Sequence, residues 1–86
     1  MAEAEKKRIE VRSKMSGVFY RKPAPDQPPY VEMGSVVKKK QVLALLETMK
    51  VFQKVKSPAS GEVVEIAAED EVALGDGDLM FIIETG

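Results

Sequence analysis

One apolar stretch occurs twice in the chain, first as Leu43-Ala44-Leu45-Leu46-Glu47-Thr48 and again as Met80-Phe81-Ile82-Ile83-Glu84-Thr85. A second pair of matching segments precedes these two, Ser13-Lys14-Met15-Ser16-Gly17 and Ser57-Pro58-Ala59-Ser60-Gly61. Because the order of the segments is the same in both halves, we interpret the chain as two copies of one unit. Each copy has room for four short strands, so the repeat predicts about eight strands with an internal pseudo-twofold axis.

The other apolar segments also have the length of strands. They are rich in β-branched residues, are bounded by turn-forming residues, and include residues 9–12, 18–20, 51–55 and 63–67. Short segments at regular spacing are typical of a small all-β sandwich or barrel. The best candidate for a helix is Val42 to Lys50, because an unbroken apolar run fits a buried helix as well as a buried strand.

The composition excludes several classes of function. The chain has 86 residues, no Cys, no His, and 13 basic against 14 acidic side chains. Without Cys and His it has no disulfide, no Cys–His metal site and no catalytic triad built on these residues. Balanced charge gives no sign of nucleic-acid binding, and no apolar run approaches the roughly 20 residues of a membrane span. We expect no metal, no nucleic-acid partner and no membrane partner.

The N-terminus is polar and does not resemble a signal peptide. Residues 1–8 are therefore interpreted as a leader or the stub of a linker, and residues 9–86 as one folded domain. This favours a cytoplasmic module, or an organellar one whose targeting segment is not seen in this sequence.

The two copies differ in length at one place. From Gly17 to Val37 there are 20 positions, whereas from Gly61 to Val72 there are 11, which predicts an insertion of nine residues. The extra residues fall within 21–30, a segment that holds four of the five prolines. Proline fixes φ and lacks a backbone donor, so we expect a semi-rigid protruding loop. Such a loop is either an inert surface feature or a stiff finger held near a site.

The two copies meet at Glu47-Thr48-Met49-Lys50-Val51. An apolar run ends at Leu46 and a mixed strand begins at Val51, so the chain reversal is predicted at Met49 and Lys50. Hairpin tips usually carry Gly, Asn or Asp, and a departure from turn preference is expected at a functional site. Lys50 is therefore either an ordinary solvated lysine or a lysine presented for modification.

The sequence around this reversal resembles the biotinyl domains of biotin-dependent carboxylases. Their usual motif is E-A-M-K-M, and Met49 and Lys50 match its central Met and Lys. Thr48 and Val51 stand where the family usually has Ala and Met. Upstream, residues 15–26 resemble the biotin carboxyl carrier proteins of multisubunit acetyl-CoA carboxylase, in which an inserted loop called the thumb lies against the biotin.

The resemblance implies a fold and a set of site residues. The expected fold is a flattened β-barrel or sandwich of two four-stranded antiparallel sheets, with pseudo-twofold symmetry and a protruding thumb loop. Biotin would be attached covalently to Lys50, with Met49 as the flanking residue read by the biotin protein ligase. Thr48 and Val51 complete the recognition segment. The thumb would contain Pro23, Ala24, Pro25 and Asp26.

The resemblance also implies a function. The domain would be a carrier and not itself an enzyme, shuttling carboxybiotin from biotin carboxylase to carboxyltransferase. The resemblance to acetyl-CoA carboxylase implies a role in fatty acid synthesis, although the acyl-CoA is chosen by the carboxyltransferase and not by the carrier.

Two alternatives to a biotin carrier stay open at this point. Lipoyl domains of 2-oxo acid dehydrogenases have the motif E-T-D-K-A, and Glu47 and Thr48 match its first two residues. Met49 stands where that motif has Asp, which favours biotin. The second alternative is an unmodified structural or binding module of the same fold.

Overall fold

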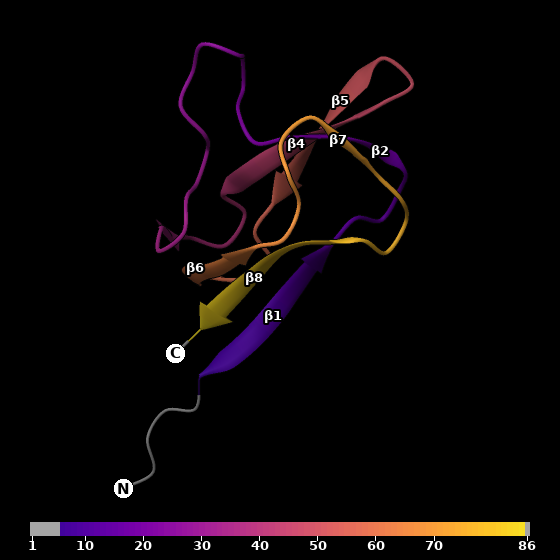
Figure 1. The fold of residues 1–86 in the computed structure, drawn as a ribbon. Coiled ribbons are helices and arrows are strands. Elements are labelled where there is room, and N and C mark those ends of the chain that lie inside the picture. The colour runs from indigo at the N-terminus through magenta and orange to yellow at the C-terminus, as the bar shows by residue number, and fades with distance from the viewer. Residues whose placement is uncertain (1–5, 86) are drawn as a thin grey trace, which may run out of the picture.

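The computed structural model describes residues 6–85, which form eight strands in two antiparallel four-stranded sheets (Figure 1). The first sheet has the order β1-β8-β6-β3, and its strands are β1 (Lys7–Arg12), β8 (Leu79–Thr85), β6 (Gly61–Ile66) and β3 (Val36–Val37). The second has the order β5-β4-β2-β7, and its strands are β5 (Val51–Lys56), β4 (Val42–Thr48), β2 (Gly17–Tyr20) and β7 (Val72–Leu74). The prediction of an all-β fold with two such sheets is confirmed, and the described residues include no helix able to cross a membrane.

The repeat in sequence is a repeat in structure. If each strand is replaced by the strand four places further along the chain, the order of the first sheet becomes the order of the second. β4 and β8 share the same succession of buried and half-buried positions. Ser13 and Ser57, each 2% exposed, both donate their hydroxyls to a backbone carbonyl two residues later. These matches support the predicted pseudo-twofold relation.

The hydrophobic core lies between the two sheets. Its largest fully buried side chains are Phe19, Phe81, Leu43, Ile83, Val37 and Val63. The rings of Phe19 and Phe81 pack at a tilt, with centroids 5.7 Å apart, and so join the two sheets at the centre. The run from Val42 is a strand and not a helix because β4 pairs on both sides, with β2 and with β5.

The first strand begins two residues before the predicted start of the domain at residue 9. β1 begins at Lys7, so residues 7 and 8 belong to the first strand and not to a leader. Lys7 pairs with Thr85, which adds a rung to the ladder at the end of β8. The rest of the expected leader, apart from Lys6, lies outside the described residues.

The insertion in the first half is shorter than predicted. Val37 pairs with Gly61, and the matching pair in the other sheet is Leu74 with Gly17, so Leu74 and not Val72 is the counterpart of Val37. From Gly61 to Leu74 there are 13 positions against 20 in the first half, so the net insertion is seven residues and not nine. Matching two valines by residue type gave the wrong register, which strand pairing corrects.

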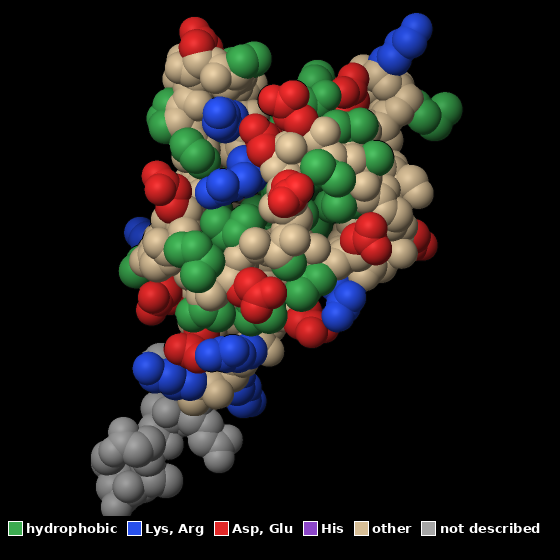
Figure 2. Space-filling view, viewed as in Figure 1, with side chains coloured by type: hydrophobic (Ala, Val, Ile, Leu, Met, Phe, Trp, Pro, Cys, Tyr) green, Lys and Arg blue, Asp and Glu red, His purple; other side chains and the backbone are tan. Residues whose placement is uncertain are grey.

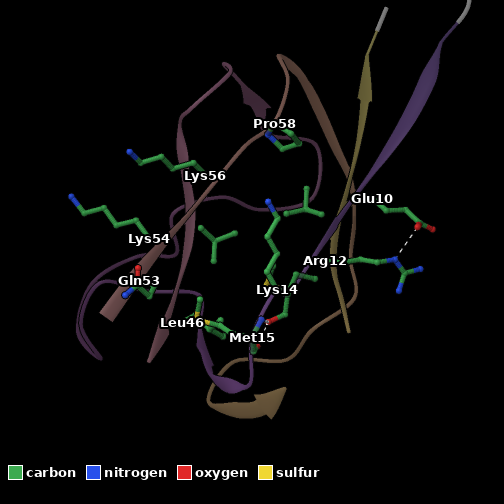
Figure 3. A pocket seen from close by; sticks show the side chains of 13 residues that line it. Glu10, Arg12, Lys14, Met15, Leu46, Gln53, Lys54, Lys56 and Pro58 are labelled. Atoms are coloured by element: carbon green, nitrogen blue, oxygen red, sulfur yellow. Dashed lines mark hydrogen bonds and ion pairs between the residues drawn. The ribbon is translucent and has the colours of Figure 1, made fainter. Parts of the chain in front are cut away.

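Two projections rise from one end of the molecule, opposite the start of β1 and the end of β8 (Figure 1). One is the β4–β5 hairpin, and the other is the loop that follows β2. Figure 2 shows the surface hollowed between these projections, with charges of both signs interspersed over the visible face. A different groove lies between the edge strands β1 and β5 (Figure 3).

Candidate functional site

The β4–β5 hairpin closes through a two-residue tip. Thr48 pairs with Val51, and Met49 and Lys50 between them have φ of 48° and 66°. Positive φ at both central residues is the pattern of a type I′ turn, whose twist matches that of the two strands it joins. The predicted reversal at Met49 and Lys50 is therefore confirmed. Both side chains are exposed, Met49 to 94%, so the tip presents a thioether and an amine to solvent.

Backbone conformation makes this tip unusual. Side chains other than Gly, Asn and Asp are disfavoured at positive φ, at a cost of order 1 kcal/mol or more for each residue. A turn that keeps Met and Lys in this region is less stable than the same turn built from Asn-Gly. Such local strain is typical of functional sites, which agrees with the interpretation of Lys50 as a presented lysine.

Thr48 is half-buried, and its methyl group packs over Gly17 of the adjacent strand. A Cβ placed on Gly17 would lie 2.8 Å from Cγ2 of Thr48, so the threonine fits because residue 17 has no side chain. Val51, on the other side of the tip, is 53% exposed. Thr48 therefore fixes the hairpin on its neighbour β2, whereas Val51 faces solvent.

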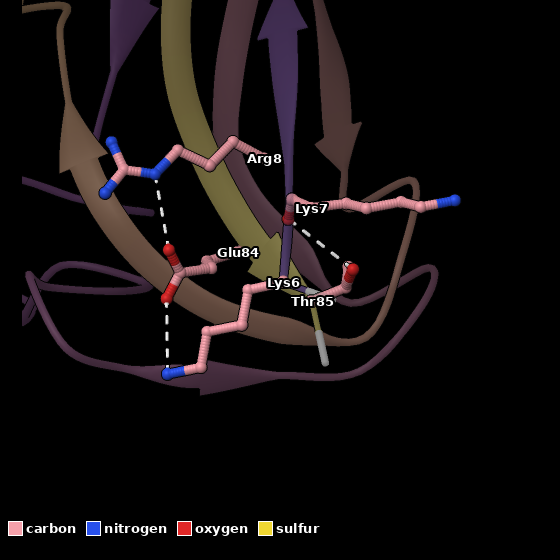
Figure 4. Close-up of polar contacts among 5 residues, drawn as sticks. All are labelled: Lys6, Lys7, Arg8, Glu84 and Thr85. Atoms are coloured by element: carbon pink, nitrogen blue, oxygen red, sulfur yellow. Dashed lines mark hydrogen bonds and ion pairs between the residues drawn. The ribbon is translucent and has the colours of Figure 1, made fainter. Parts of the chain in front are cut away.

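The environment of Lys50 differs from that of its counterpart in the other half. β1 and β5 are matched strands of six residues, and Lys6 precedes β1 as Lys50 precedes β5. Lys6 and Arg8 both form ion pairs with Glu84, at 3.9 and 3.3 Å (Figure 4). Phe52 occupies the position that corresponds to Arg8, and neither Lys50 nor Glu47 forms an ion pair within residues 6–85. The Lys50 amine is therefore not held by a carboxylate of the described chain.

The proline-rich loop is fastened at its base. The backbone N–H of Tyr30 donates to the carbonyl of Arg21, at 2.9 Å, and closes the loop. The N–H of Arg21 donates to Oδ1 of Asp70, at 2.8 Å, and its guanidinium donates to the carbonyl of Val31. Within the loop, the N–H of Gln27 donates to the carbonyl of Ala24, at 3.1 Å. These contacts hold the protruding loop in a defined position relative to β2.

A groove of about 210 Å³ runs between this loop and the outer face of the second sheet. It is lined by Tyr20, Leu45 and Phe52 from the sheet, by Lys22, Pro23, Ala24 and Pro25 from the loop, and by Asp70 and Glu71. The rings of Tyr20 and Phe52 pack with centroids 5.8 Å apart and form an aromatic wall. The groove thus combines an apolar wall with charged residues at its margin.

Tyr20 links this wall to the end of β4, close to Lys50. Its hydroxyl donates to Oε1 of Glu47, at 3.0 Å. This hydrogen bond, with smaller contributions from burial and from the charges of Glu47, Glu71 and Asp70, raises the pKa of Tyr20 above its ordinary value of 10.0. Tyr20 thus stays protonated at physiological pH and keeps the carboxylate of Glu47, three residues before Lys50, in a fixed place.

The structure brings together only some of the residues singled out from the sequence. Pro23, Ala24 and Pro25 line the groove, but Asp26 does not. None of the four residues from Thr48 to Val51 lines it. Tyr20, Leu45 and Phe52 were not predicted. Side chains alternate along β5, so Phe52 lies on the same outward face as Lys54. An aromatic side chain on a face that otherwise carries lysines is the feature of the sequence that could have indicated a binding surface at Phe52.

Known proteins share this fold and this sequence pattern. Residues 6–83 match the family profile described as biotin-requiring enzyme. The chain belongs to this family. The match covers most of the 86 residues and includes both halves of the repeat.

Relatives of this family domain include carrier proteins of plants and bacteria. The chain is 40% identical over 74 residues to the chloroplastic biotin carboxyl carrier protein of acetyl-CoA carboxylase from Glycine max, which covers 86% of the chain and 28% of the relative. It is 42% identical over 69 residues to the biotin carboxyl carrier protein of acetyl-CoA carboxylase from Streptococcus pyogenes, covering 78% of the chain and 42% of the relative. The chain therefore spans less than half the length of these curated relatives.

Solved structures confirm the fold of the family domain. A single-chain, multi-domain long-chain acyl-CoA carboxylase matches all of the chain with a TM-score of 0.79 at 16% identity, over 8% of its own length. The urea carboxylase of Kluyveromyces lactis matches 95% of the chain with a TM-score of 0.73 at 23% identity, over 7% of its length. At these identities the likeness concerns the fold alone.

Proposed function

We propose that this domain is a biotin carboxyl carrier with biotin attached to Lys50. It carries carboxyl groups from biotin carboxylase to carboxyltransferase within acetyl-CoA carboxylase, and so serves fatty acid synthesis. The observation that carries the proposal is the two-residue tip that exposes Lys50 beside Met49. The names of the relatives support biotin over lipoate and acetyl-CoA carboxylase over other carboxylases.

Attachment requires only that a ligase reach Lys50. The amine, once deprotonated, forms an amide with the activated carboxyl group of biotin, and the activating group leaves with the bonding electrons. Both neighbours at the tip are exposed, Met49 and Val51, so the ligase can approach the lysine from several sides. Because no carboxylate of the described residues pairs with Lys50, no ion pair has to break first.

The groove between the proline-rich loop and the second sheet, here called the thumb groove, has a lining that suits the ring system of biotin. Once bound, biotin supplies a ureido nitrogen that accepts and releases a carboxyl group. Tyr20, Phe52 and the loop prolines provide the apolar walls that exclude water from a ring system, while Lys22, Asp70 and Glu71 provide polar groups at the margin. Phe52, the second residue of β5, lies two residues or about 7 Å from Lys50, within reach of a lysine side chain that folds back. We propose that Pro23, Ala24 and Pro25 cover the group in this position, with Asp26 at the outer tip of the thumb.

The domain supplies no acid, base or metal to the reaction in this proposal. Its three partners are the biotin protein ligase, biotin carboxylase and carboxyltransferase, which dock in turn on one rigid body. Tethering the carrier within a complex raises the local concentration of the transferred group at both catalytic sites. Since the relatives include chloroplastic plant proteins and bacterial ones, we propose the cytoplasm or an organelle as its compartment.

The proposal is tested by the intact mass of protein produced in cells that contain both biotin and lipoyl ligases. We expect a biotin adduct, mapped by peptide analysis to Lys50. Lys50→Arg keeps the fold and the positive charge but abolishes the adduct. Lys54→Arg, which changes another exposed lysine of the same hairpin, keeps it. The purified holo-domain then accepts labelled carboxyl groups from biotin carboxylase with ATP and bicarbonate.

Other outcomes would contradict the assignment. A lipoyl adduct would move the domain to the 2-oxo acid dehydrogenases. An unmodified Lys50, even with the ligase of the native host, would make the domain a binding module. A Lys50→Arg protein that still took up biotin would show that the attachment site is elsewhere.

A further inference from the structure

A second groove lies where the edges of the two sheets meet, between β1 and β5. Its volume is about 330 Å³, and it shares no lining residue with the thumb groove. Its lining comes from Glu10 to Met15, from Gln53 to Lys56, and from Leu46, Pro58 and Met80. β1 and β5 are counterparts in the repeat, so the groove is bounded by the equivalent edge strand of each half.

The groove is positively charged, whereas the molecule as a whole is not. The chain as a whole has a net charge of −1, yet the groove is lined by Arg12, Lys14, Lys54 and Lys56 against a single acid, Glu10. Glu10 forms an ion pair with Arg12, whose Nε lies 2.9 Å from Oε1 of Glu10. Figure 3 shows this pair turned to one side of the groove, while Lys54 and Lys56 extend from β5 on the other side, with their amines pointing away from Lys14.

Three lysines of the groove have no partner carboxylate in the part of the chain that the structure describes. Lys14 stands between the two strands, and it joins Lys54 and Lys56 in having no ion pair within residues 6–85 (Figure 3). Three lysines on one groove attract an anionic ligand by their summed positive potential. In the repeat, Glu10 and Lys54 occupy matching positions, so the charged residues of the β5 side are both lysines, whereas the β1 side carries an acid beside Arg12.

The floor of the groove is apolar. Val11, Leu46 and Met80 are buried beneath it, and Met15 is 41% exposed at its side. Thioether side chains adapt to differently shaped apolar partners. Within residues 6–85, β1 pairs with β8 alone and β5 with β4 alone, so in this part of the chain each strand has one edge whose backbone groups can bond to an extended chain.

We propose that this groove binds an extended acidic segment of a partner protein. Apolar side chains of that segment lie on the floor of the groove, and its carboxylates meet Lys14, Lys54 and Lys56. A small polyanion would use the lysines but not the apolar floor, so the floor favours a peptide. The proposal goes beyond the carrier function and does not require modification of Lys50.

The test is a binding titration with a fluorescein-labelled nine-residue peptide that alternates Glu and Leu. Lys14→Glu combined with Lys56→Glu reverses two charges of the groove, one between the strands and one on β5, and we expect the Kd to rise at least tenfold. Lys38→Glu combined with Lys39→Glu makes the same change of charge in the basic turn after β3, and we expect a change of less than twofold. Both double variants are surface changes, and their unfolding curves check that they remain folded.

Two further peptides separate the apolar from the ionic contribution. A peptide with Ser in place of Leu, and one with Gln in place of Glu, are each expected to bind at least fivefold more weakly. Equal loss of binding in both double variants, unchanged binding of the Ser peptide, or displacement by inorganic pyrophosphate at the same affinity would overturn the proposal. So would the absence of measurable binding. Intact-mass analysis of Lys50 reports on the carrier function separately.

Discussion

At the scale of single residues, the two halves place glycine at different points of the same turns. Lys40 has φ of 75°, and its counterpart in the second half is Gly77, with φ of 91°. Each N–H donates to a buried serine carbonyl, Lys40 to that of Ser57 at 2.8 Å and Gly77 to that of Ser13 at 2.7 Å. The turn therefore requires this backbone conformation, and Lys40 adopts it against its preference.

Lys40→Gly is expected to stabilise the domain. Removing the strain of positive φ contributes about 1–2 kcal/mol, and the larger entropy of glycine in the unfolded chain offsets about 0.4–1 kcal/mol of this. The free energy of unfolding in urea should therefore rise by about 0.5–1 kcal/mol. Lys39→Gly, at a neighbour without positive φ, should lower it. Equal effects of the two changes would show that Lys40 is not strained.

At the scale of the elements, two glycines set how closely strands pack. A Cβ on Gly61 would collide with the backbone carbonyl of Glu84 in β8, and one on Gly17 would lie 2.7 Å from the carbonyl oxygen of Glu47 in β4. Backbone atoms in paired strands cannot move aside as a side chain can. These two glycines thus fix the distance between β6 and β8 and between β2 and β4.

Gly61→Ala is expected to destabilise the domain by about 2–3 kcal/mol, because the added methyl overpacks two paired backbones. Gly75→Ala is the matched control, since its Cβ would lie 3.8 Å from Oδ2 of Asp78 and meet nothing closer. The control should change the free energy of unfolding by less than about 0.5 kcal/mol. Thermal and urea unfolding of both variants compare the two; similar stabilities would refute the role assigned to Gly61.

The elements also show what could be predicted from the sequence. The strands, the repeat and the tip at Met49 and Lys50 follow from apolar patterning and from local turn chemistry, which short segments of sequence record. The thumb groove could not be predicted, because Tyr20, Leu45 and Phe52 come from three strands whose alignment depends on pairing register. The matching of Val37 to Val72 failed for the same reason.

At the scale of the whole molecule, the proline-rich loop is an addition to a symmetric body. Deleting residues 23–29 removes seven residues, which equals the net difference in length between the halves. Only Lys22 then remains between Arg21 and Tyr30. We expect the sandwich to stay folded, with a free energy of unfolding within about 1 kcal/mol of the parent, because shortening a surface loop has a small entropic effect. Unfolding curves and the dispersion of the amide NMR spectrum check this.

The same deletion separates attachment from transfer. If the thumb covers biotin as proposed, the shortened domain is still modified on Lys50 but exchanges carboxyl groups with biotin carboxylase several times more slowly. Unchanged exchange would assign the loop no part in transfer. Lys22→Ala, at the root of the same loop, serves as a control for loss of a single groove residue.

The placement of Lys50 and of the chain ends has a mechanical consequence. Lys7 and Thr85 are paired neighbours at one pole, and the hairpin tip lies at the other (Figure 1). The seven residues of β4 alone span about 23 Å of this length. A linker fused at either end would leave the molecule on the side away from Lys50, and the rigid body would act as a lever arm. Rotation about such a linker would sweep the lysine across a shell of at least that radius.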